Sequence, residues 1–238
     1  MSDHIIDVNT MFGFWPWRRV DMRLETLLSI AAAHGVTRVC TACTRSFFID
    51  HHAGNDEVLS AAAEHEMVFP VGGIDMRAGP VPKQISRWCE AGLRWFRFFT
   101  AQAWTLDNLV FQDLLGPLGE HGCVLMIPAR MELSAIASVA DRYDHPIIVL
   151  EPSFGTLAEL HCLLQRPHVY ADVCLMNAVD GLSWLAEQGH GDQLLFGSRA
   201  PLCYMASALG LVNDPIIDDE LRGNILAGNA ARLMQESA

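Results

Sequence analysis

The feature that most constrains the fold is an alternation, repeated along the chain, of short apolar runs and longer segments with helical spacing. Short apolar runs predict buried strands, and apolar residues spaced three and four apart predict amphipathic helices. Gly35, Gly92 and Gly122 follow three of the helical segments and are typical of C-terminal helix caps. We expect strands at residues 4–9, 36–43, 68–75, 93–99, 123–127, 147–150, 169–175 and 194–197. We expect helices at residues 22–34, 56–66, 81–91, 106–121, 132–143, 157–165, 178–188 and 218–234.

This order predicts an α/β fold in which parallel strands are joined by right-handed helical crossovers. Eight such units close into a (β/α)8 TIM barrel, with outer helices and a site at the C-terminal ends of the strands. The alternative is an open doubly wound sheet, but the loop after the first strand holds only Gly13 and no glycine-rich phosphate motif. Because no linker or low-complexity segment interrupts the pattern, we expect one domain over residues 1–238.

The composition indicates the kind of partner. Hydrophobic residues make up 51% of the chain, and 16 Lys and Arg against 28 Asp and Glu give a net charge of −12. This balance argues against non-specific binding to nucleic acid or to an anionic membrane. No apolar stretch reaches the roughly 18 residues of a membrane helix, and the first residues lack a signal-peptide pattern. The seven cysteines lie in strand-like or helix-like surroundings, so we expect reduced thiols and a cytoplasmic location; a homo-oligomer stays open.

Several motifs resemble the amidohydrolase-related family. Residues 6–11 (IDVNTM) look like its first strand, which ends in a His-x-His pair. Residues 196–201 (FGSRAP) are similar to its late Phe-Gly-Ser-Asp-x-Pro, and residues 225–233 (ILAGNAARL) to its closing Ile-Leu-x-x-Asn-Ala-x-x-Leu. Residues 107–123 fit the helix before the fifth strand. The resemblance implies a TIM barrel and an activity that cleaves C–N or C–O bonds, usually with water activated by one or two divalent metals.

The metal ligands implied by that resemblance are substituted here. Asn9 and Met11 stand at the histidine pair, and Arg199 stands at the late aspartate. The histidines after the fifth and sixth strands fall near Pro128 and Glu151. An arginine has no lone pair to give a metal. We therefore expect no metal cofactor, with zinc as the less favoured alternative.

Two other patterns could signal a metal site, and neither is convincing. His51 and His52 are adjacent and are expected in a loop, where neighbouring side chains do not usually converge on one ion. Cys40 and Cys43 lie within one strand, where a separation of three residues sends the side chains to opposite faces.

Arginines gather at the expected strand ends in a chain that is otherwise poor in basic residues. Guanidinium groups bind carboxylates through paired hydrogen bonds, so this pattern indicates a small anionic substrate. We assign candidate catalytic roles to Arg199, Glu151, Asp75 and Asn9. Candidate substrate-binding residues are Arg130, Arg97, Arg45, Ser198, Asn177, Trp17 and Arg18. The alternative for Arg199 is a structural ion pair with Glu151 or Asp75, and for Arg97 it is stacking on aromatic rings or pairing across the barrel.

The leading hypothesis is a metal-independent hydrolase that acts on a small carboxylate-bearing lactone, ester or amide. Arg199 and Arg130 would hold the carboxylate or the oxyanion, and Glu151 or Asp75 would activate water. A decarboxylase or other lyase, an isomerase and a non-catalytic barrel are the alternatives.

Overall fold

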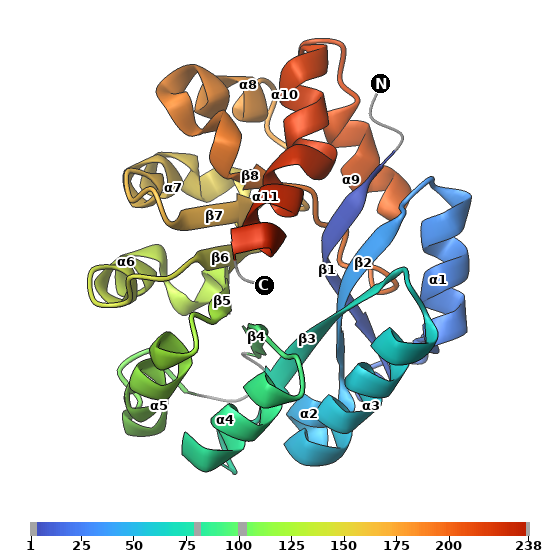
Figure 1. Ribbon diagram of the computed structural model, residues 1–238. Helices are drawn as coiled ribbons and strands as arrows, with labels where there is room; N and C mark the ends of the chain where they lie inside the picture. Colours follow the sequence, from blue (N-terminus) through green and yellow to red (C-terminus); the bar gives the residue numbers. More distant parts are fainter. Residues whose placement is uncertain (1–3, 79–81, 100–103, 237–238) are drawn as a thin grey trace.

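The computed structural model describes residues 4–78, 82–99 and 104–236. Within them, eight parallel strands form one sheet in the order β1 to β8 (Figure 1). The two edges of the sheet meet, because the backbone N–H of Val8 donates to Phe196 O at 2.9 Å and that of Arg199 donates to Asn9 O at 2.7 Å. The predicted (β/α)8 barrel is confirmed.

The elements follow the expected alternation. The strands are β1 (Ile6–Phe12), β2 (Arg38–Cys43), β3 (Val68–Ile74), β4 (Trp95–Phe98), β5 (Val124–Pro128), β6 (Ile147–Leu150), β7 (Val169–Asp172) and β8 (Leu194–Leu195). The helices are α1 (Leu24–Ala33), α2 (Arg45–Phe48), α3 (His51–Glu64), α4 (Pro82–Glu90), α5 (Leu109–Glu120), α6 (Leu133–Ala140), α7 (Leu157–Leu164), α8 (Gly181–Leu185), α9 (Met205–Val212), α10 (Asp219–Gly223) and α11 (Asn229–Glu236).

Two apolar clusters hold the barrel together, one inside the strands and one between the strands and the helices. Alternate residues of each strand enter different clusters because successive side chains point to opposite faces. Cys40 joins the inner cluster and Cys43 the outer one, as the spacing predicts. Trp95 fills the barrel interior from β4, so Arg97, two residues later, also points inward.

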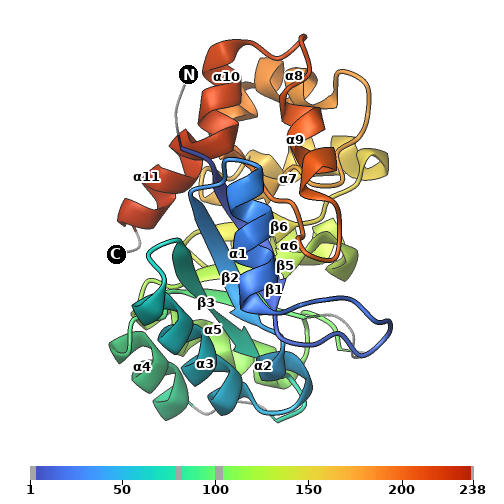
Figure 2. The same ribbon diagram turned by 90° about the vertical axis from the view of Figure 1, so that its right-hand side faces the viewer.

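The two ends of the barrel are closed differently. α11 crosses one end (Figure 1), where Ala230, Leu233 and Met234 join the inner cluster. The loop between β1 and α1 projects from the opposite side of the molecule (Figure 2). Every helix in the described ranges is too short or too polar to span a bilayer.

Three features differ from the sequence-based expectation. α2 and α9 were not expected, and α2 is too short to show helical periodicity. The prediction that His51 and His52 lie in a loop is wrong, because both begin α3. Asp50 caps that helix by accepting from the backbone N–H groups of His52, at 2.8 Å, and of Ala53, at 3.3 Å. The first strand was expected to end at Asn9, but β1 continues beyond Asn9 to Phe12.

Candidate active site

A cavity of about 400 Å³ opens at the C-terminal ends of the strands. Aromatic rings form part of its wall: the Trp17 ring stacks on Phe99 with centroids 6.1 Å apart, and Trp15 meets Phe99 edge to face at 5.8 Å. The lining residues are Trp15, Trp17, Arg18, Arg97, Phe99, Pro128, Arg130, Glu151 and Arg199. The structure thus brings six of the residues predicted from the sequence into one cavity.

Arg97 forms the innermost charged group of this cavity. Arg97 is only 1% exposed, and its Nη1 donates to Asn9 Oδ1 at 2.6 Å. Its Nη2 donates to Glu151 Oε1 at 3.2 Å. Burial lowers the pKa of the guanidinium, and the neighbouring carboxylates Glu151 and Asp172 oppose that shift.

Glu151 is shared between two guanidinium groups. Its Oε1 lies 3.1 Å from Arg199 Nε as well as 3.2 Å from Arg97 Nη2. The Arg199 contact is an ion pair whose Nε–H is poorly aligned for a hydrogen bond, and within the described chain the Nε atoms of Arg97 and Arg199 have no acceptor. Glu151 and Arg199 both have left-handed backbones, with φ of 60° and 62°. Such conformations cost energy in non-glycine residues and cluster at functional sites.

Asn9 and Asp172 lie beneath the charged groups. Asn9 Nδ2 donates to Asp172 Oδ2 at 2.6 Å, and the Glu151 backbone N–H donates to Asp172 Oδ1 at 3.1 Å. Burial raises the pKa of Asp172 to about 6, and the charge of Glu151 adds to the effect. Asp172 is not among the site residues predicted from the sequence. Its place two residues after the inward-facing Tyr170 is the signal that could have found it.

Arg18 and Arg130 complete the rim of the cavity. Arg18 Nη2 donates to Leu202 O at 2.7 Å, which ties the aromatic loop after β1 to the segment after β8. Arg130 is exposed and lies in a 3-10 turn directly after β5.

Besides Asn9, which lies beneath the cavity, four predicted residues lie outside its lining. Asp75 is held by Arg77, whose Nη2 lies 2.7 Å from Asp75 Oδ2. Arg45 is exposed on α2 and reaches Glu57 at 3.9 Å, and Asn177 is exposed. Ser198 is buried below the cavity, where its backbone N–H donates to Asp7 Oδ1 at 3.0 Å and its hydroxyl donates to Asp7 Oδ2.

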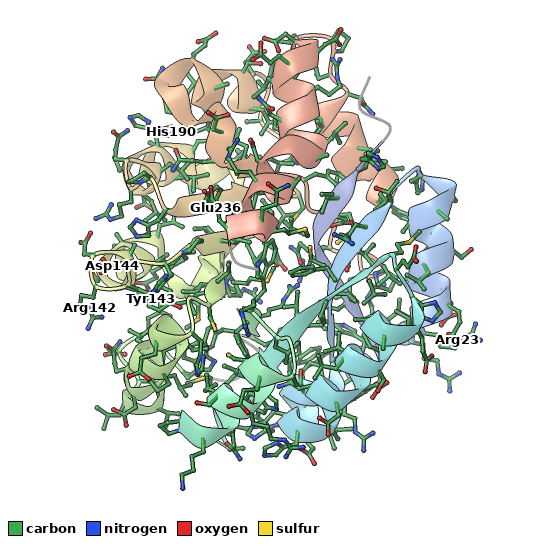
Figure 3. All side chains as sticks on the ribbon, viewed as in Figure 1. Arg23, Arg142, Tyr143, Asp144, His190 and Glu236 are labelled. Atoms are coloured by element: carbon green, nitrogen blue, oxygen red, sulfur yellow. The ribbon has the colours of Figure 1, made fainter. Side chains whose placement is uncertain are left out.

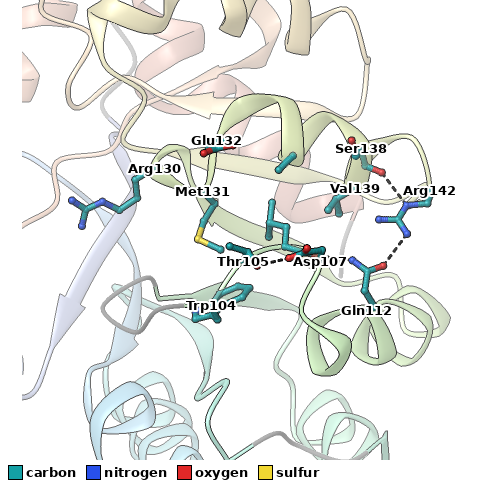
Figure 4. Close-up of a pocket in the computed structure, with 12 residues that line it drawn as sticks. Trp104, Thr105, Asp107, Gln112, Arg130, Met131, Glu132, Ser138, Val139 and Arg142 are labelled. Atoms are coloured by element: carbon teal, nitrogen blue, oxygen red, sulfur yellow. Dashed lines mark hydrogen bonds between the residues drawn. The ribbon is translucent and has the colours of Figure 1, made fainter.

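A separate cleft of about 530 Å³ lies between α6 and the segment that leads into α5 (Figure 4). Two of its charged side chains already pair with other lining residues: Arg142 donates to Gln112 Oε1 at 2.8 Å, and Asp107 accepts from the Thr105 hydroxyl. Arg142 lies on the outer ring of helices (Figure 3). Arg130 borders both hollows, and its side chain points away from the other labelled residues of this cleft (Figure 4). We therefore place the candidate site in the strand-end cavity.

The residues at the strand ends do not fit a divalent metal. The oxygen of Glu151 already lies on two guanidinium groups, and the amide oxygen of Asn9 accepts from Arg97. A cation placed there would be repelled by both arginines. Met11 is buried in the barrel interior, and no cluster of three or more His, Cys, Asp or Glu side chains within the described ranges could hold a metal ion.

Sequence comparison matches the chain to no family model and to no curated protein. Comparison of structures finds the same fold in proteins of low identity. An uncharacterized TIM-barrel protein of Bordetella bronchiseptica is 17% identical, with a TM-score of 0.77 over 98% of this chain and 99% of the other. The 5-carboxyvanillate decarboxylase of Sphingomonas paucimobilis is 13% identical, with a TM-score of 0.79 and the same coverage. A candidate 2-pyrone-4,6-dicarboxylic acid hydrolase of Pseudomonas putida is 16% identical, with a TM-score of 0.74 over 98% of each chain.

The chain has the fold of these barrels. At such identities the similarity establishes the architecture, which agrees with the fold that the sequence motifs imply. Activity and substrate have to be argued from the residues of the cavity.

Proposed function

We propose that this protein is an amidohydrolase-related enzyme that hydrolyses a small, planar, carboxylate-bearing lactone, ester or amide without a resident metal ion. The observation that carries the proposal is the content of the strand-end cavity. Four guanidinium groups and a single carboxylate line it, in a chain whose net charge is −12. A local excess of positive charge between aromatic walls suits a planar anion.

The free hydrogen-bonding capacity of the arginines supports binding of a carboxylate. Within the described chain, Arg97 Nε is a buried donor without a hydrogen-bond acceptor, and Arg199 Nε meets Glu151 Oε1 at 3.1 Å only as an ion pair. Unpaired buried donors are costly, so a ligand oxygen that accepts from them would be stabilised. The rings of Trp15, Trp17 and Phe99 would cover the faces of a planar ligand.

Glu151 is the group that could activate water. A substrate carboxylate would compete with Glu151 for Arg199, while Arg97 keeps Glu151 in place. Glu151 would then accept a proton from a water molecule while the oxygen of that water molecule attacks the substrate carbonyl. An arginine N–H would stabilise the resulting oxyanion, and the proton would pass from Glu151 to the leaving oxygen or nitrogen.

Decarboxylation is the second candidate, and one observation favours it. Two guanidinium groups already contact Glu151 Oε1, so this oxygen is less accessible to a water molecule. The structures of similar fold also include a 5-carboxyvanillate decarboxylase and 2,6-dihydroxybenzoate decarboxylases. Carbon dioxide released from an aromatic carboxylate would identify this reaction.

The binding step can be tested with benzoate and isophthalate as probes. We expect calorimetric titration of the wild type to show binding of one or both. Arg199→Ala should weaken it about tenfold or more, because a hydrogen bond to a charged group is lost. Arg87→Ala is the matched control, since Arg87 is exposed on α4 and lies outside the cavity. Equal affinity of wild type and Arg199→Ala would contradict the proposed role of Arg199.

The reaction can be tested by screening aromatic carboxylates and carboxylated lactones for acid production and for carbon dioxide. Glu151→Gln should slow hydrolysis about a hundredfold or more, because the amide cannot accept the proton. Retained hydrolysis by this variant would exclude Glu151 as the base.

Metal independence can be tested directly. We expect elemental mass spectrometry of freshly purified protein to find far less than one zinc, manganese or iron per chain. A chelator should leave turnover unchanged. A stoichiometric metal whose removal abolishes turnover would overturn this part of the proposal.

A further inference from the structure

Four residues, three on strands and one directly after β6, close a ring of hydrogen bonds around the floor of the cavity. Asp172 on β7 accepts from Asn9 Nδ2 on β1 at 2.6 Å, and Asn9 Oδ1 accepts from Arg97 Nη1 on β4 at 2.6 Å. Arg97 Nη2 donates to Oε1 of Glu151, the residue directly after β6, at 3.2 Å. The backbone N–H of Glu151 donates to Asp172 Oδ1 at 3.1 Å and so closes the ring. Each member therefore constrains the next.

The direction of this ring is set by Asp172. Its carboxylate accepts at both oxygens, so the Asn9 amide must turn its NH2 group toward Asp172. The amide oxygen of Asn9 is then left to face Arg97, which can only donate. An amide turned the other way would set an NH2 group against the guanidinium.

Asp172 also acts on Glu151 through the backbone. Glu151 has a φ of 60°, a left-handed conformation that a non-glycine residue keeps only where its surroundings hold it. The hydrogen bond from its N–H to Asp172 is one such restraint. Asp172 is 0% exposed and does not line the cavity. A fully buried carboxyl group is costly unless its hydrogen bonds serve the surrounding structure.

We propose that Asp172 is a positioning residue, which fixes the Asn9 amide and the Glu151 backbone so that Arg97 and Glu151 hold the geometry needed to bind and turn over a carboxylate. The proposal rests on the proposed function of the cavity. It assigns to β7 a role that none of the residues predicted from the sequence carries.

The test exchanges the side chains of Asn9 and Asp172, which form one hydrogen bond of the ring. Asp172→Asn sets one NH2 group against another, and Asn9→Asp sets one carboxylate against another. The double variant Asn9→Asp/Asp172→Asn conserves charge and shape and reverses the hydrogen bond. Its introduced carboxylate can accept from both the introduced amide and Arg97, and the amide oxygen at position 172 can still accept from the Glu151 N–H.

The expected result is loss in each single variant and recovery in the double variant. Isophthalate affinity, measured by calorimetry, should fall about 10- to 100-fold in either single variant, because a displaced guanidinium loses a hydrogen bond to the charged ligand. It should return to the wild-type value in the double variant. Asp113→Asn, an exposed change of the same type on α5, should bind like the wild type. Circular dichroism and denaturant unfolding of all variants measure folding separately.

The outcomes separate this proposal from the proposed function. If the wild type binds neither isophthalate nor benzoate, the proposed function fails. Non-additivity of the two changes in denaturant unfolding then still shows whether the ring forms. If the wild type binds but both single variants bind equally well, the proposed function stands and the positioning role is overturned. Recovery of stability without recovery of affinity in the double variant also overturns it, because Asp172 would then serve stability alone.

Discussion

At the scale of single residues, the acids below the cavity join the first strand to the segment after the last strand. Asp7 is fully buried and accepts from the backbone N–H groups of Asn9 and Ser198, each at 3.0 Å. Burial raises its pKa to about 7. Ser198, a predicted binding residue, donates hydrogen bonds to Asp7 from its backbone N–H and its hydroxyl. Its role toward a substrate stays a prediction.

The raised pKa of Asp7 leads to a prediction about stability and pH. A carboxyl group whose pKa rises from 3.8 to about 7 on folding binds its proton more tightly in the folded state. Its contribution is complete below about pH 4 and is lost as the pH rises through about 7, at most about 1.4 kcal/mol per pH unit. Asp7→Asn should make that decline shallower in denaturant unfolding measured from pH 4 to 8. An unchanged slope would exclude Asp7 as the titrating group, and Asp113→Asn serves as the control.

At the scale of elements, α2 supports the aromatic loop after β1. Phe48 of α2 lies 5.3 Å from the Trp17 ring centre, and Phe47 stacks on Phe99 at 5.3 Å. α2 can lie this close to α3 because Gly54 has no side chain. A Cβ at Gly54 would fall 2.2 Å from the backbone nitrogen of Ser46. The aromatic wall of the cavity thus depends on a four-residue helix and one glycine.

Trp17 should favour planar ligands over flexible ones. It is 57% exposed and stacks on Phe99 at the cavity. Trp17→Ala should weaken isophthalate binding about 2- to 10-fold, the size of an aromatic pair, and should leave binding of acyclic glutarate nearly unchanged. Calorimetry with isophthalate and with glutarate gives the ratio of wild-type to variant affinity for each ligand. Leu109→Ala, which removes a more exposed apolar side chain on α5, is the control. Parallel losses for both ligands in Trp17→Ala would argue against stacking.

At the scale of the whole molecule, the residues that close the barrel at one end are separate from the candidate site at the other end. α11 closes one end through Leu233 and its neighbours, and the cavity opens at the strand ends where β1 and β8 lead into their loops. This division agrees with the general pattern of such barrels, in which the face opposite the site serves stability.

Leu233→Ala tests that separation. Removing a fully buried leucine from the inner cluster should lower the free energy of unfolding by about 2–5 kcal/mol. Isophthalate affinity of the folded variant should equal that of the wild type, because α11 lies at the other end of the barrel. Gln235→Ala on the exposed side of α11 is the control for unfolding. Weakened binding by a folded Leu233→Ala variant would show that the two ends are coupled.

The order of strands and helices can be derived from the amino-acid sequence, because apolar periodicity and glycine caps are local properties. It therefore predicted the barrel, and it predicted Arg97, Arg130, Glu151 and Arg199 at the strand ends, where the cavity includes them. Arg18, predicted to bind substrate from the loop after the first strand, also lines the cavity. The single domain, the cytoplasmic location and the homo-oligomer stay predictions. Which of the predicted residues meet depends on the folded chain. Asp75 and Arg45 pair with Arg77 and Glu57 outside the cavity. Asp172 joins Asn9 across 163 residues of sequence, because closure of the barrel brings β1 and β7 together.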